Sequence, residues 1–261
     1  MSFNTKRLVE SAIMIALGTV LSLFTFSGPW VYGGGITICS MLPLVILSHR
    51  YGTKWGVFSS LVYAVVQMIL GFSNVQYAQN VWQAIGIILF DYIIAFGVIG
   101  FADCFNGVIK NRYASIAVGT VVVLLGRLAC HFISGWIIWE AMFPNELGWA
   151  APIWSIAYNA SYMVPEIIIT TIAAVILYKP LGRYFTRCPE VDQQRHQGEP
   201  ITRKKWPAFL LCFFFGFLGA HKFYEDKIGV GALYLFTGGL FGIGWFIDCF
   251  VLLFKTNPYT V

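Results

Sequence analysis

The chain has 261 residues, of which 58% are hydrophobic and only 11% are charged. Soluble domains carry about 25% charged residues, so the composition excludes a soluble globular protein and predicts one that crosses a membrane several times. The net charge of +5 therefore bears on membrane topology and not on nucleic-acid binding. The six cysteines occur singly, without a C-x-x-C pair, so we expect buried free thiols and neither a disulfide framework nor a zinc site.

Eight apolar segments follow one another along the chain, and each is a candidate membrane helix. A helix needs about 20 apolar residues to cross the hydrocarbon core. The first segment follows Lys6 and Arg7 and is too long for the apolar part of a signal peptide. The second is short and contains Pro43, so we expect it to be irregular and shielded by its neighbours. The predicted spans cover residues 8–26, 36–48, 55–72, 80–105, 115–139, 152–177, 206–224 and 229–254.

Basic residues are distributed unequally between the two sides of this map. With the N-terminus in the cytoplasm, nearly all lysines and arginines fall on the inner side. Only Lys222 and Lys227 fall on the outer side, and Arg127 lies within a span. An excess of basic residues marks cytoplasmic loops. The asymmetry therefore predicts eight helices with both termini in the cytoplasm.

One long polar segment divides the chain. It contains Pro189, Gly198 and Pro200 and few apolar residues, so we interpret residues 181–202 as a cytoplasmic linker. Residues 1–180 would form a six-helix unit and residues 203–261 a two-helix unit. The predicted fold class is an all-α membrane protein.

Four polar or charged residues lie inside the apolar stretches, at positions 91, 127, 131 and 159. A charge near the bilayer centre costs about 2.5–3.5 kcal/mol on the insertion scale, so such residues usually mark a functional site. Asp91, His131 and Asn159 lie at similar depths when counted from the outer ends of their helices. They therefore predict a pocket that is open to the outside.

Helical periodicity adds two residues to this pocket. Arg127, His131, Gly135 and Trp139 recur every four residues and share one stripe of the fifth helix. A carboxylate at position 91 can compensate a ligand cation, and the amide of Asn159 can read a donor–acceptor edge. The indole face of Trp139 can hold a cation, with about 2 kcal/mol when desolvated. The set predicts a small, flat ligand that is cationic or rich in hydrogen-bonding groups.

Structural alternatives exist for these residues. Asp91 and Arg127 could form an ion pair that locks two helices, and Arg127 could pair instead with Glu166. Trp154 and its neighbours Trp136 and Trp149 could be aromatic residues of the membrane interface.

Four segments of the chain carry a family resemblance: SAIMIALGTVLSLF at Ser11–Phe24, FDYIIAF at Phe90–Phe96, RLACHFISGWIIW at Arg127–Trp139 and WSIAYN at Trp154–Asn159. Through them, residues 6–180 resemble the thiamine-specific substrate-binding subunits, or S components, of energy-coupling factor (ECF) transporters. The resemblance implies a six-helix bundle in a bacterial plasma membrane that binds thiamine from outside, without a cofactor. It implies three partners, a membrane coupling subunit (EcfT type) and two cytoplasmic ATPases (EcfA type).

The resemblance also implies roles for individual residues. His131 and Trp139 would flank the ligand rings, Asn159 would read the aminopyrimidine, Gly135 would border the hydroxyethyl end, and Tyr92 would form a hydrogen bond nearby. Two positions depart from the family pattern. Asp91 stands in place of a glutamate, and Trp154 stands in place of a tyrosine. These departures leave a thiamine precursor or another vitamin as an alternative ligand. The predicted substrate-binding residues are Asp91, Tyr92, His131, Gly135, Trp139, Trp154 and Asn159.

Two further surfaces follow from the same resemblance. Trp30, Tyr32 and Tyr77 of the outer loops would form a lid. Ala12 and Ala16, a small-xxx-small pair, would contact the coupling subunit, with packing inside the bundle as the alternative.

The C-terminal segment resembles another family, the TM-2 domain. The similar residues are GFLGAHKFY at Gly216–Tyr224 and WFID at Trp245–Asp248. We expect Asp248 to face His221 or Lys222, and we expect a structural or regulatory role.

Two other classes of function compete with transport. A membrane enzyme could use Asp91 and His131 as an acid–base pair, but no nucleophile motif, H-E-x-x-H sequence or other metal motif accompanies them. A scaffold would use the polar residues only to pair helices. Gly33–Gly35 lacks the lysine and hydroxyl of a phosphate-binding loop, so ATP hydrolysis would need partner subunits. We therefore predict a binding subunit and not an enzyme.

Overall fold

The computed structural model describes residues 3–28, 30, 33–191 and 202–260. The chain forms two compact units, Met1–Cys188 and Pro189–Val261. Each unit is described by itself below.

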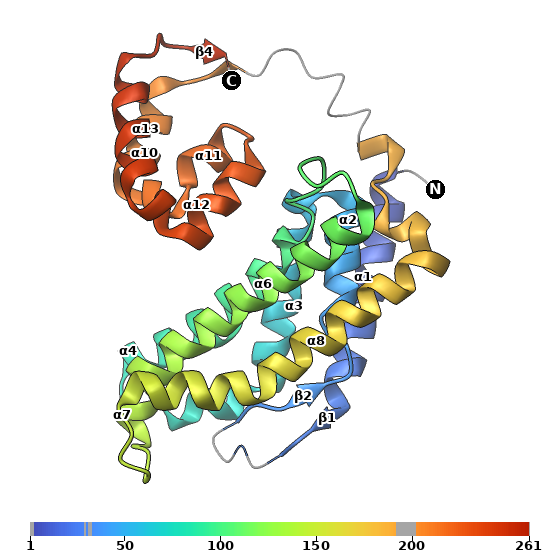
Figure 1. The fold of residues 1–261 in the computed structure, drawn as a ribbon, viewed down its shortest axis with the longest axis vertical. Helices are drawn as coiled ribbons and strands as arrows, with labels where there is room; N and C mark the ends of the chain where they lie inside the picture. The colour runs from blue at the N-terminus through green and yellow to red at the C-terminus, as the bar shows by residue number, and fades with distance from the viewer. Residues whose placement is uncertain (1–2, 29, 31–32, 192–201, 261) are drawn as a thin grey trace. The chain divides into compact units, whose positions relative to one another are not determined.

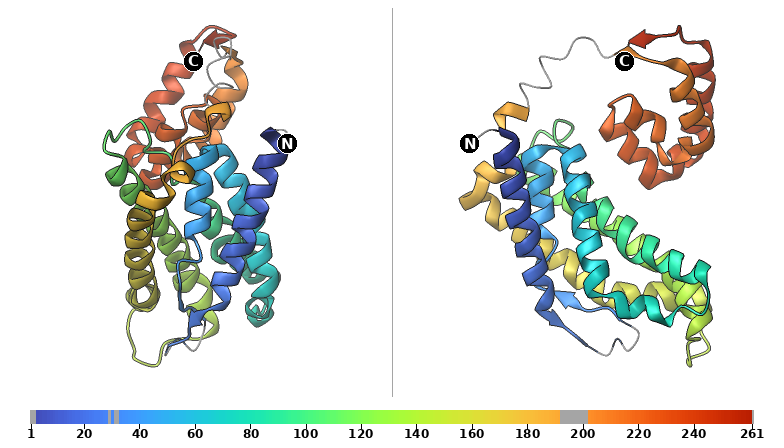
Figure 2. Two further views of the ribbon diagram at one scale, coloured as in Figure 1. Left: turned by 90° about the vertical axis from the view of Figure 1, so that its right-hand side faces the viewer. Right: turned by 180° about the vertical axis from the view of Figure 1, so that it is seen from behind.

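The first unit is a helical bundle (Figures 1 and 2). Helices α6 and α8 pack side by side along much of their length, and α2 packs against α1, α3 and α8. Its longer helices are α1 (Phe3–Leu23), α2 (Leu42–Tyr51), α3 (Thr53–Leu70), α6 (Arg112–Ser134) and α8 (Ala151–Phe185).

Four helical stretches of the described chain are long and apolar enough to cross a membrane. Shorter apolar helices occupy other parts of the chain. Together they confirm the predicted all-α membrane class. The four stretches are Thr53–Leu70, Val81–Phe101, Arg112–Met142 and Ala151–Phe185.

Two of these stretches are not uniform α-helices. Helix α4 (Val81–Ile87) continues into the π-helix η2 (Ile88–Ile93), then α5 (Ile94–Gly97) and the 3-10 helix η3 (Val98–Phe101). Helix α6 continues into the π-helix η4 (Gly135–Trp139) and then α7 (Glu140–Met142). A π-helix makes i→i+5 hydrogen bonds and often occurs at functional sites.

The predicted second span, residues 36–48, is irregular as expected. It begins with strand β2 (Ile36–Thr37), which pairs antiparallel with β1 (Thr25–Phe26), and α2 follows. Pro43 lies in the first turn of α2, where its missing N–H group costs no helical hydrogen bond. A 3-10 helix, η1 (Phe72–Tyr77), follows α3.

The first unit extends further than the boundary at residue 180 that the sequence suggested. Helix α8 continues to Phe185, and the backbone N–H of Cys188 donates to the carbonyl of Arg50 at 2.9 Å. Arg187 forms an ion pair with the buried Asp103. A buried carboxylate needs a partner, so these contacts hold the segment to the bundle.

The second unit consists of short helices. The predicted spans 206–224 and 229–254 are each interrupted by a glycine with positive φ, Gly219 (76°) and Gly242 (81°), a conformation that other residues adopt at a cost. The described elements are β3 (Thr202–Arg203), α10 (Lys205–Phe215), η5 (Gly216–Leu218), α11 (Ala220–Tyr224), α12 (Ile228–Phe241), α13 (Ile243–Phe254) and β4 (Tyr259–Thr260).

Asp248 satisfies the polar groups inside this second unit. Its carboxylate accepts from Lys222 Nζ at 2.7 Å and lies 3.0 Å from His221 Nε2. Tyr234 also donates to it. The structure therefore shows both contacts that the sequence offered as alternatives for Asp248.

Candidate functional site

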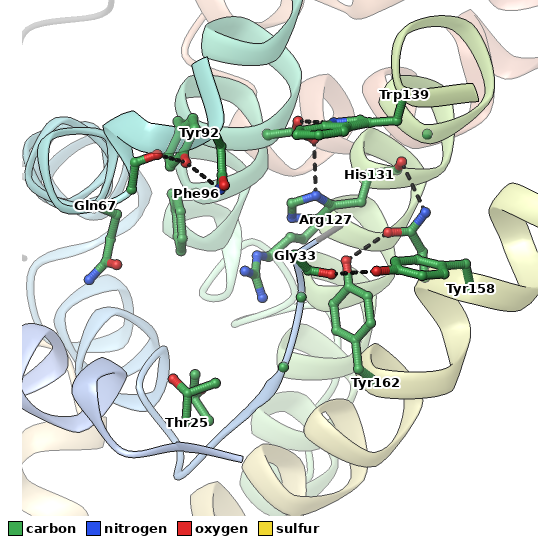
Figure 3. Close-up of a pocket in the computed structure, with 18 of the residues that line it drawn as sticks. Thr25, Gly33, Gln67, Tyr92, Phe96, Arg127, His131, Trp139, Tyr158 and Tyr162 are labelled. Atoms are coloured by element: carbon green, nitrogen blue, oxygen red, sulfur yellow. Dashed lines mark hydrogen bonds and ion pairs between the residues drawn. The ribbon is translucent and has the colours of Figure 1, made fainter. Parts of the chain in front are cut away.

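The first unit encloses a cavity of about 390 Å³. In Figure 3, Tyr92 and Phe96 line it from one side and Tyr158 and Tyr162 from the other. The substrate-binding residues predicted from the sequence all line this one cavity. They are Asp91, Tyr92, His131, Gly135, Trp139, Trp154 and Asn159.

Asp91 is the centre of a hydrogen-bond network in the cavity wall. Its Oδ2 accepts from Ser134 Oγ and from Trp139 Nε1, each at 2.9 Å. Its Oδ1 lies 3.1 Å from His131 Nδ1. Three donors on one carboxylate fix its orientation and that of the indole ring. The serine was not among the predicted residues.

The ring of His131 is only partly satisfied. With a proton on Nδ1, the ring donates to Asp91 and leaves Nε2 as an acceptor in the neutral form. Nε2 is buried and has no hydrogen-bond partner among the described residues. A buried nitrogen without a partner costs free energy, which a ligand in the cavity can recover.

Asn159 is held in place by its own helix neighbours. Its Nδ2 donates to the carbonyl of Ser155 at 2.9 Å, and its Oδ1 accepts from Tyr162 Oη at 2.6 Å. The side chain is nearly buried, with 6% of the residue exposed. These bonds fix the direction in which the amide can meet a ligand. The phenol of Tyr162 was not predicted to take part.

Gly135 lines the cavity, and its missing side chain also serves helix packing. A Cβ atom there would overlap Ser155 Oγ and lie 2.9 Å from Asn159 Nδ2. The glycine therefore lets η4 approach α8 closely.

Tyr92 and Trp154 face the cavity from opposite helices. Tyr92 Oη donates to the carbonyl of Gly71 at 2.8 Å and accepts from Asn74 Nδ2 at 3.1 Å. Trp154 packs 5.8 Å from the ring of Tyr158. Both rings are thus held by neighbours within the bundle.

The described segment that precedes β2, residues 33–35, lines part of the cavity. Tyr158 Oη donates to the carbonyl of Gly33 at 2.8 Å. A Cβ atom on Gly34, which has φ of 102°, would lie 2.7 Å from the ring of Tyr162. The glycines of this segment were not predicted to contact the site, because a residue without a side chain leaves no periodic signal.

The three predicted lid residues have different positions. The ring of Trp30 lies 5.6 Å from that of Tyr162, and Tyr77 lies 6.2 Å from the ring of Trp139. Both therefore contact residues that line the cavity. Tyr32 lies outside the described residues.

Arg127 pairs with Glu166 and not with Asp91. Its Nη1 lies 3.0 Å from Glu166 Oε2, and its guanidinium lies over the ring of Phe96. Thr37 donates to the other oxygen of this glutamate. Of the two ion pairs considered from the sequence, the structure therefore shows the second.

The charges of the cavity wall favour a cation. Asp91, Glu140 and Arg127 line the cavity, and the arginine is compensated by Glu166 behind it. The two carboxylates at positions 91 and 140 are bonded to neutral donors or to His131. The wall thus carries uncompensated negative charge. Glu140 was missed by the sequence reasoning, although it directly follows Trp139.

Comparison with known families identifies the family of the first unit. Residues 8–186 match the family model described as thiamine transporter protein, which covers well over half of the chain. The chain belongs to the thiamine transporter protein family. This confirms the resemblance stated for residues 6–180.

Two members of this family illustrate the relationship. The thiamine transporter ThiT of Bacillus subtilis (strain 168) is 33% identical over 188 residues, a match that covers 68% of this chain and 92% of that protein. The solved structure of ThiT from Listeria monocytogenes is 22% identical, with a TM-score of 0.56, and it covers 71% of this chain and all of that one. The second likeness shows the fold alone. The relatives are transporters, which confirms that the chain is not an enzyme.

The C-terminal unit matches a second family. Residues 202–250 match the TM2 domain model. Two TM2 domain-containing proteins of Dictyostelium discoideum are 51% identical over 43 residues and 58% identical over 41 residues, and each match covers 27% of that relative. The predicted TM-2 likeness is thus confirmed as well.

Proposed function

We propose that this protein is the thiamine-binding S component of an ECF-type transporter in a bacterial plasma membrane. It would capture thiamine outside the cell for ATP-driven uptake by partner subunits. The observation that carries the proposal is the negatively charged, aromatic cavity in the family's membrane unit. Thiamine joins a permanently cationic thiazolium ring to an aminopyrimidine, which matches that chemistry.

The cavity offers a partner for each part of the vitamin. The indole of Trp139 and the carboxylate of Asp91, joined by a hydrogen bond, would hold the cationic ring. His131 Nε2, which has no partner among the described residues, would accept from a ligand N–H group. Asn159 would meet the pyrimidine edge, with its amide oriented by Tyr162.

The glycine segment of residues 33–35 would form part of the lid. Tyr158 Oη donates a hydrogen bond to the carbonyl of Gly33, and a bond of this kind contributes about 0.5–1.5 kcal/mol. Breaking this bond would be one step in opening the lid for ligand entry. Trp30 and Tyr77 would add aromatic contacts to the closed form.

The partner surface would be the outward face of α1. Ala12 and Ala16 are exposed on this helix, whereas Ser11 and Gly18 are buried against the bundle. The small-xxx-small pair is thus not used for packing within the described unit, and it is available to a helix of an EcfT-type coupling subunit. Two EcfA-type ATPases would supply the energy.

A tryptophan-fluorescence titration with thiamine tests the binding proposal. We expect saturable quenching in the detergent-purified protein. Asp91→Asn should weaken binding by about 10- to 150-fold, since hydrogen bonds to charged groups contribute about 1.5–3 kcal/mol. His131→Ala should also weaken it. Asp248→Asn makes the same chemical change in the second unit and should leave the affinity unchanged.

The outcomes separate the candidate ligands. Saturable quenching by a pyrimidine precursor but not by thiamine would favour the alternative substrate. The absence of any response in a folded preparation would contradict both. For the partners, Ala12→Leu and Ala16→Leu should abolish co-purification with the coupling subunit and leave thiamine binding intact, because the side chains lie away from the cavity.

A further inference from the structure

One end of the second unit gathers its charged side chains. Glu225, in the turn between α11 and α12, lies 3.1 Å from Lys227 Nζ and 3.2 Å from Lys255 Nζ. The neighbouring Asp226 pairs with Arg203. This turn therefore meets the segment that enters the unit, before α10, and the segment that leaves it, after α13.

Further contacts join the same three segments. Tyr259 Oη donates to Glu225 at 2.8 Å. Strand β3 pairs antiparallel with β4, and the backbone N–H of Lys205 donates to Asn257 Oδ1 at 3.0 Å. We call this end the charged rim. It comprises Arg203, Lys204, Lys205, Glu225, Asp226, Lys227 and Lys255.

The opposite end of the unit is apolar. The chain reverses between α12 and α13 at Gly242, and residues 236–243, FTGGLFGI, contain no charged residue. A Cβ atom on Gly239 would lie 2.9 Å from Phe217 Cα, so η5 packs against this reversal. The reversal at Gly242 and the neighbouring segment η5 are therefore suited to hydrocarbon and not to water.

The helices between the two ends are too short to cross a bilayer. Helix α12 has 14 residues and α13 has 12, which corresponds to about 21 and 18 Å at 1.5 Å per residue. The hydrocarbon core is about 30 Å thick. Large apolar residues suited to lipid are exposed on α10, at Phe213 and Phe214, and on α13, at Phe246, Phe250 and Phe254.

We propose that the second unit enters and leaves the bilayer through the same leaflet. The charged rim would bind the phosphate groups of anionic lipids, and the reversal at Gly242 would lie in the hydrocarbon. Five basic side chains face two acidic ones in the rim, which gives it net positive charge. The charges of Lys222 and Asp248, which would lie between the rim and the reversal, compensate each other in an ion pair.

Insertion through one leaflet also accounts for the position of Lys227, which was an exception to the distribution of basic residues. Two complete crossings would carry Lys227 to the outer side, and would separate Glu225 from Lys255 and Tyr259. Entry through one leaflet keeps these contacts and places Lys227 on the same side as the linker. The basic residues then agree with the positive-inside rule, with the rim on the cytoplasmic side.

Labelling of the unmodified protein tests the inference. Right-side-out and inverted membrane vesicles are treated with a membrane-impermeant amine reagent, and modified peptides are mapped by mass spectrometry. Lys227 and Lys255 have side chains that are 44% and 29% exposed. We expect both to be modified in the same vesicle orientation and neither in the other. Modification in opposite orientations would overturn the proposal.

Two cysteine variants test the depth of insertion. Lys227→Cys should react with an impermeant maleimide from the side of the rim, whereas Thr237→Cys, next to the apolar reversal, should react from neither side. Reaction of Thr237→Cys from the opposite side would show a complete crossing and contradict the inference. Wild-type protein gives the background from the native cysteines.

The lipid partner is tested on purified protein. Lys204→Gln combined with Lys205→Gln should at least halve the phosphatidylglycerol that co-purifies, because both charges belong to the rim. Lys110→Gln makes the same change on an exposed residue of the first unit and serves as the control. Equal lipid content in all variants would rule out the rim as the headgroup site.

Discussion

Trp139 Nε1 donates a hydrogen bond of 2.9 Å to Asp91 Oδ2, and each of the two residues lies in a π-helical segment. In an α-helix, four residues exceed one turn by about 40°, so a stripe spaced by four drifts around the helix. A π turn takes more residues, so the step from Gly135 to Trp139 does not continue this drift. The π segment η4 thereby keeps the indole near the line of His131 and within reach of the carboxylate.

Replacement of Gly135 tests the close contact between η4 and α8. In Gly135→Ala the added methyl group would overlap Ser155 Oγ and crowd Asn159. We expect a loss of about 1–3 kcal/mol in unfolding free energy, as for overpacking in other cores, together with weaker ligand binding. Thermal unfolding and the fluorescence titration measure the two effects.

A matched control is available on α8, the helix against which η4 packs. Gly182→Ala adds a methyl group that would lie 3.8 Å from the ring of Tyr178, an ordinary van der Waals contact, so stability and binding should hardly change. Equal behaviour of the two variants would contradict the assigned role of Gly135.

Removal of one hydroxyl tests the lid. Tyr158→Phe loses the hydrogen bond to the carbonyl of Gly33, a bond of about 0.5–1.5 kcal/mol. We expect ligand dissociation to become about 2- to 12-fold faster in a stopped-flow chase. Tyr113→Phe removes a hydroxyl at the N-terminal end of α6, from a residue that does not line the cavity, and should leave the rate unchanged. The same rate in both variants would show that the bond does not hold the lid.

The ion pair of Arg127 and Glu166 is expected to be structural. Their side chains are 13% and 3% exposed, and breaking a buried pair costs about 3–5 kcal/mol because one charge remains uncompensated. Arg127→Met should therefore lower the unfolding temperature strongly, and the double variant Arg127→Met with Glu166→Gln should recover part of the loss. Lys110→Met, on an exposed residue, is the control. A double variant less stable than either single one would contradict this role.

The polar residues that line the cavity could be predicted because a membrane makes polar residues conspicuous. Asp91, His131 and Asn159 stand out from apolar surroundings, and the helical period brings them to similar depth. Pairing partners were harder to choose, since Asp91 and Glu166 were both candidates for Arg127. Only the packing of α6 against α8 decides between them.

Backbone details were beyond the reach of the sequence. The π segments depend on local hydrogen bonding, which apolar periodicity does not report. The breaks in the C-terminal helices had a visible signal in Gly219 and Gly242, but glycine also serves close helix packing, and the sequence alone does not separate the two uses. The boundary after α8 was placed too early because the partner of Arg187, the buried Asp103, is distant in sequence.

The charged rim of the second unit should make its stability depend on pH. Burial raises the pKa of Glu225, but the hydrogen bond from Tyr259 and the pairs with Lys227 and Lys255 outweigh it and leave the pKa below its usual value of 4.5. A carboxyl group with a lowered pKa stabilises the fold above its unfolded pKa, and this contribution is lost as the pH falls through the folded pKa. Glu225→Gln should therefore destabilise the unit at neutral pH.

The difference between wild type and Glu225→Gln should shrink as the pH falls below about 4.5, the usual glutamate value. Thermal exposure of the buried Cys212 to a thiol reagent, mapped by mass spectrometry, reports unfolding of this unit. Glu146→Gln, on an exposed loop residue, is the control. A difference that is independent of pH would contradict the role of the ionised carboxylate.

A π segment is an α-helix that contains an inserted residue, so the binding cavity depends on the number of residues in its helices as well as on their identity. Ile137 lies in η4, is 61% exposed and does not line the cavity. Its deletion would remove no group that meets the ligand. It would nevertheless remove the residue that the π turn accommodates, so that η4 would close as an ordinary α-helix and Trp139 would follow Gly135 by three residues, or about 300° of rotation.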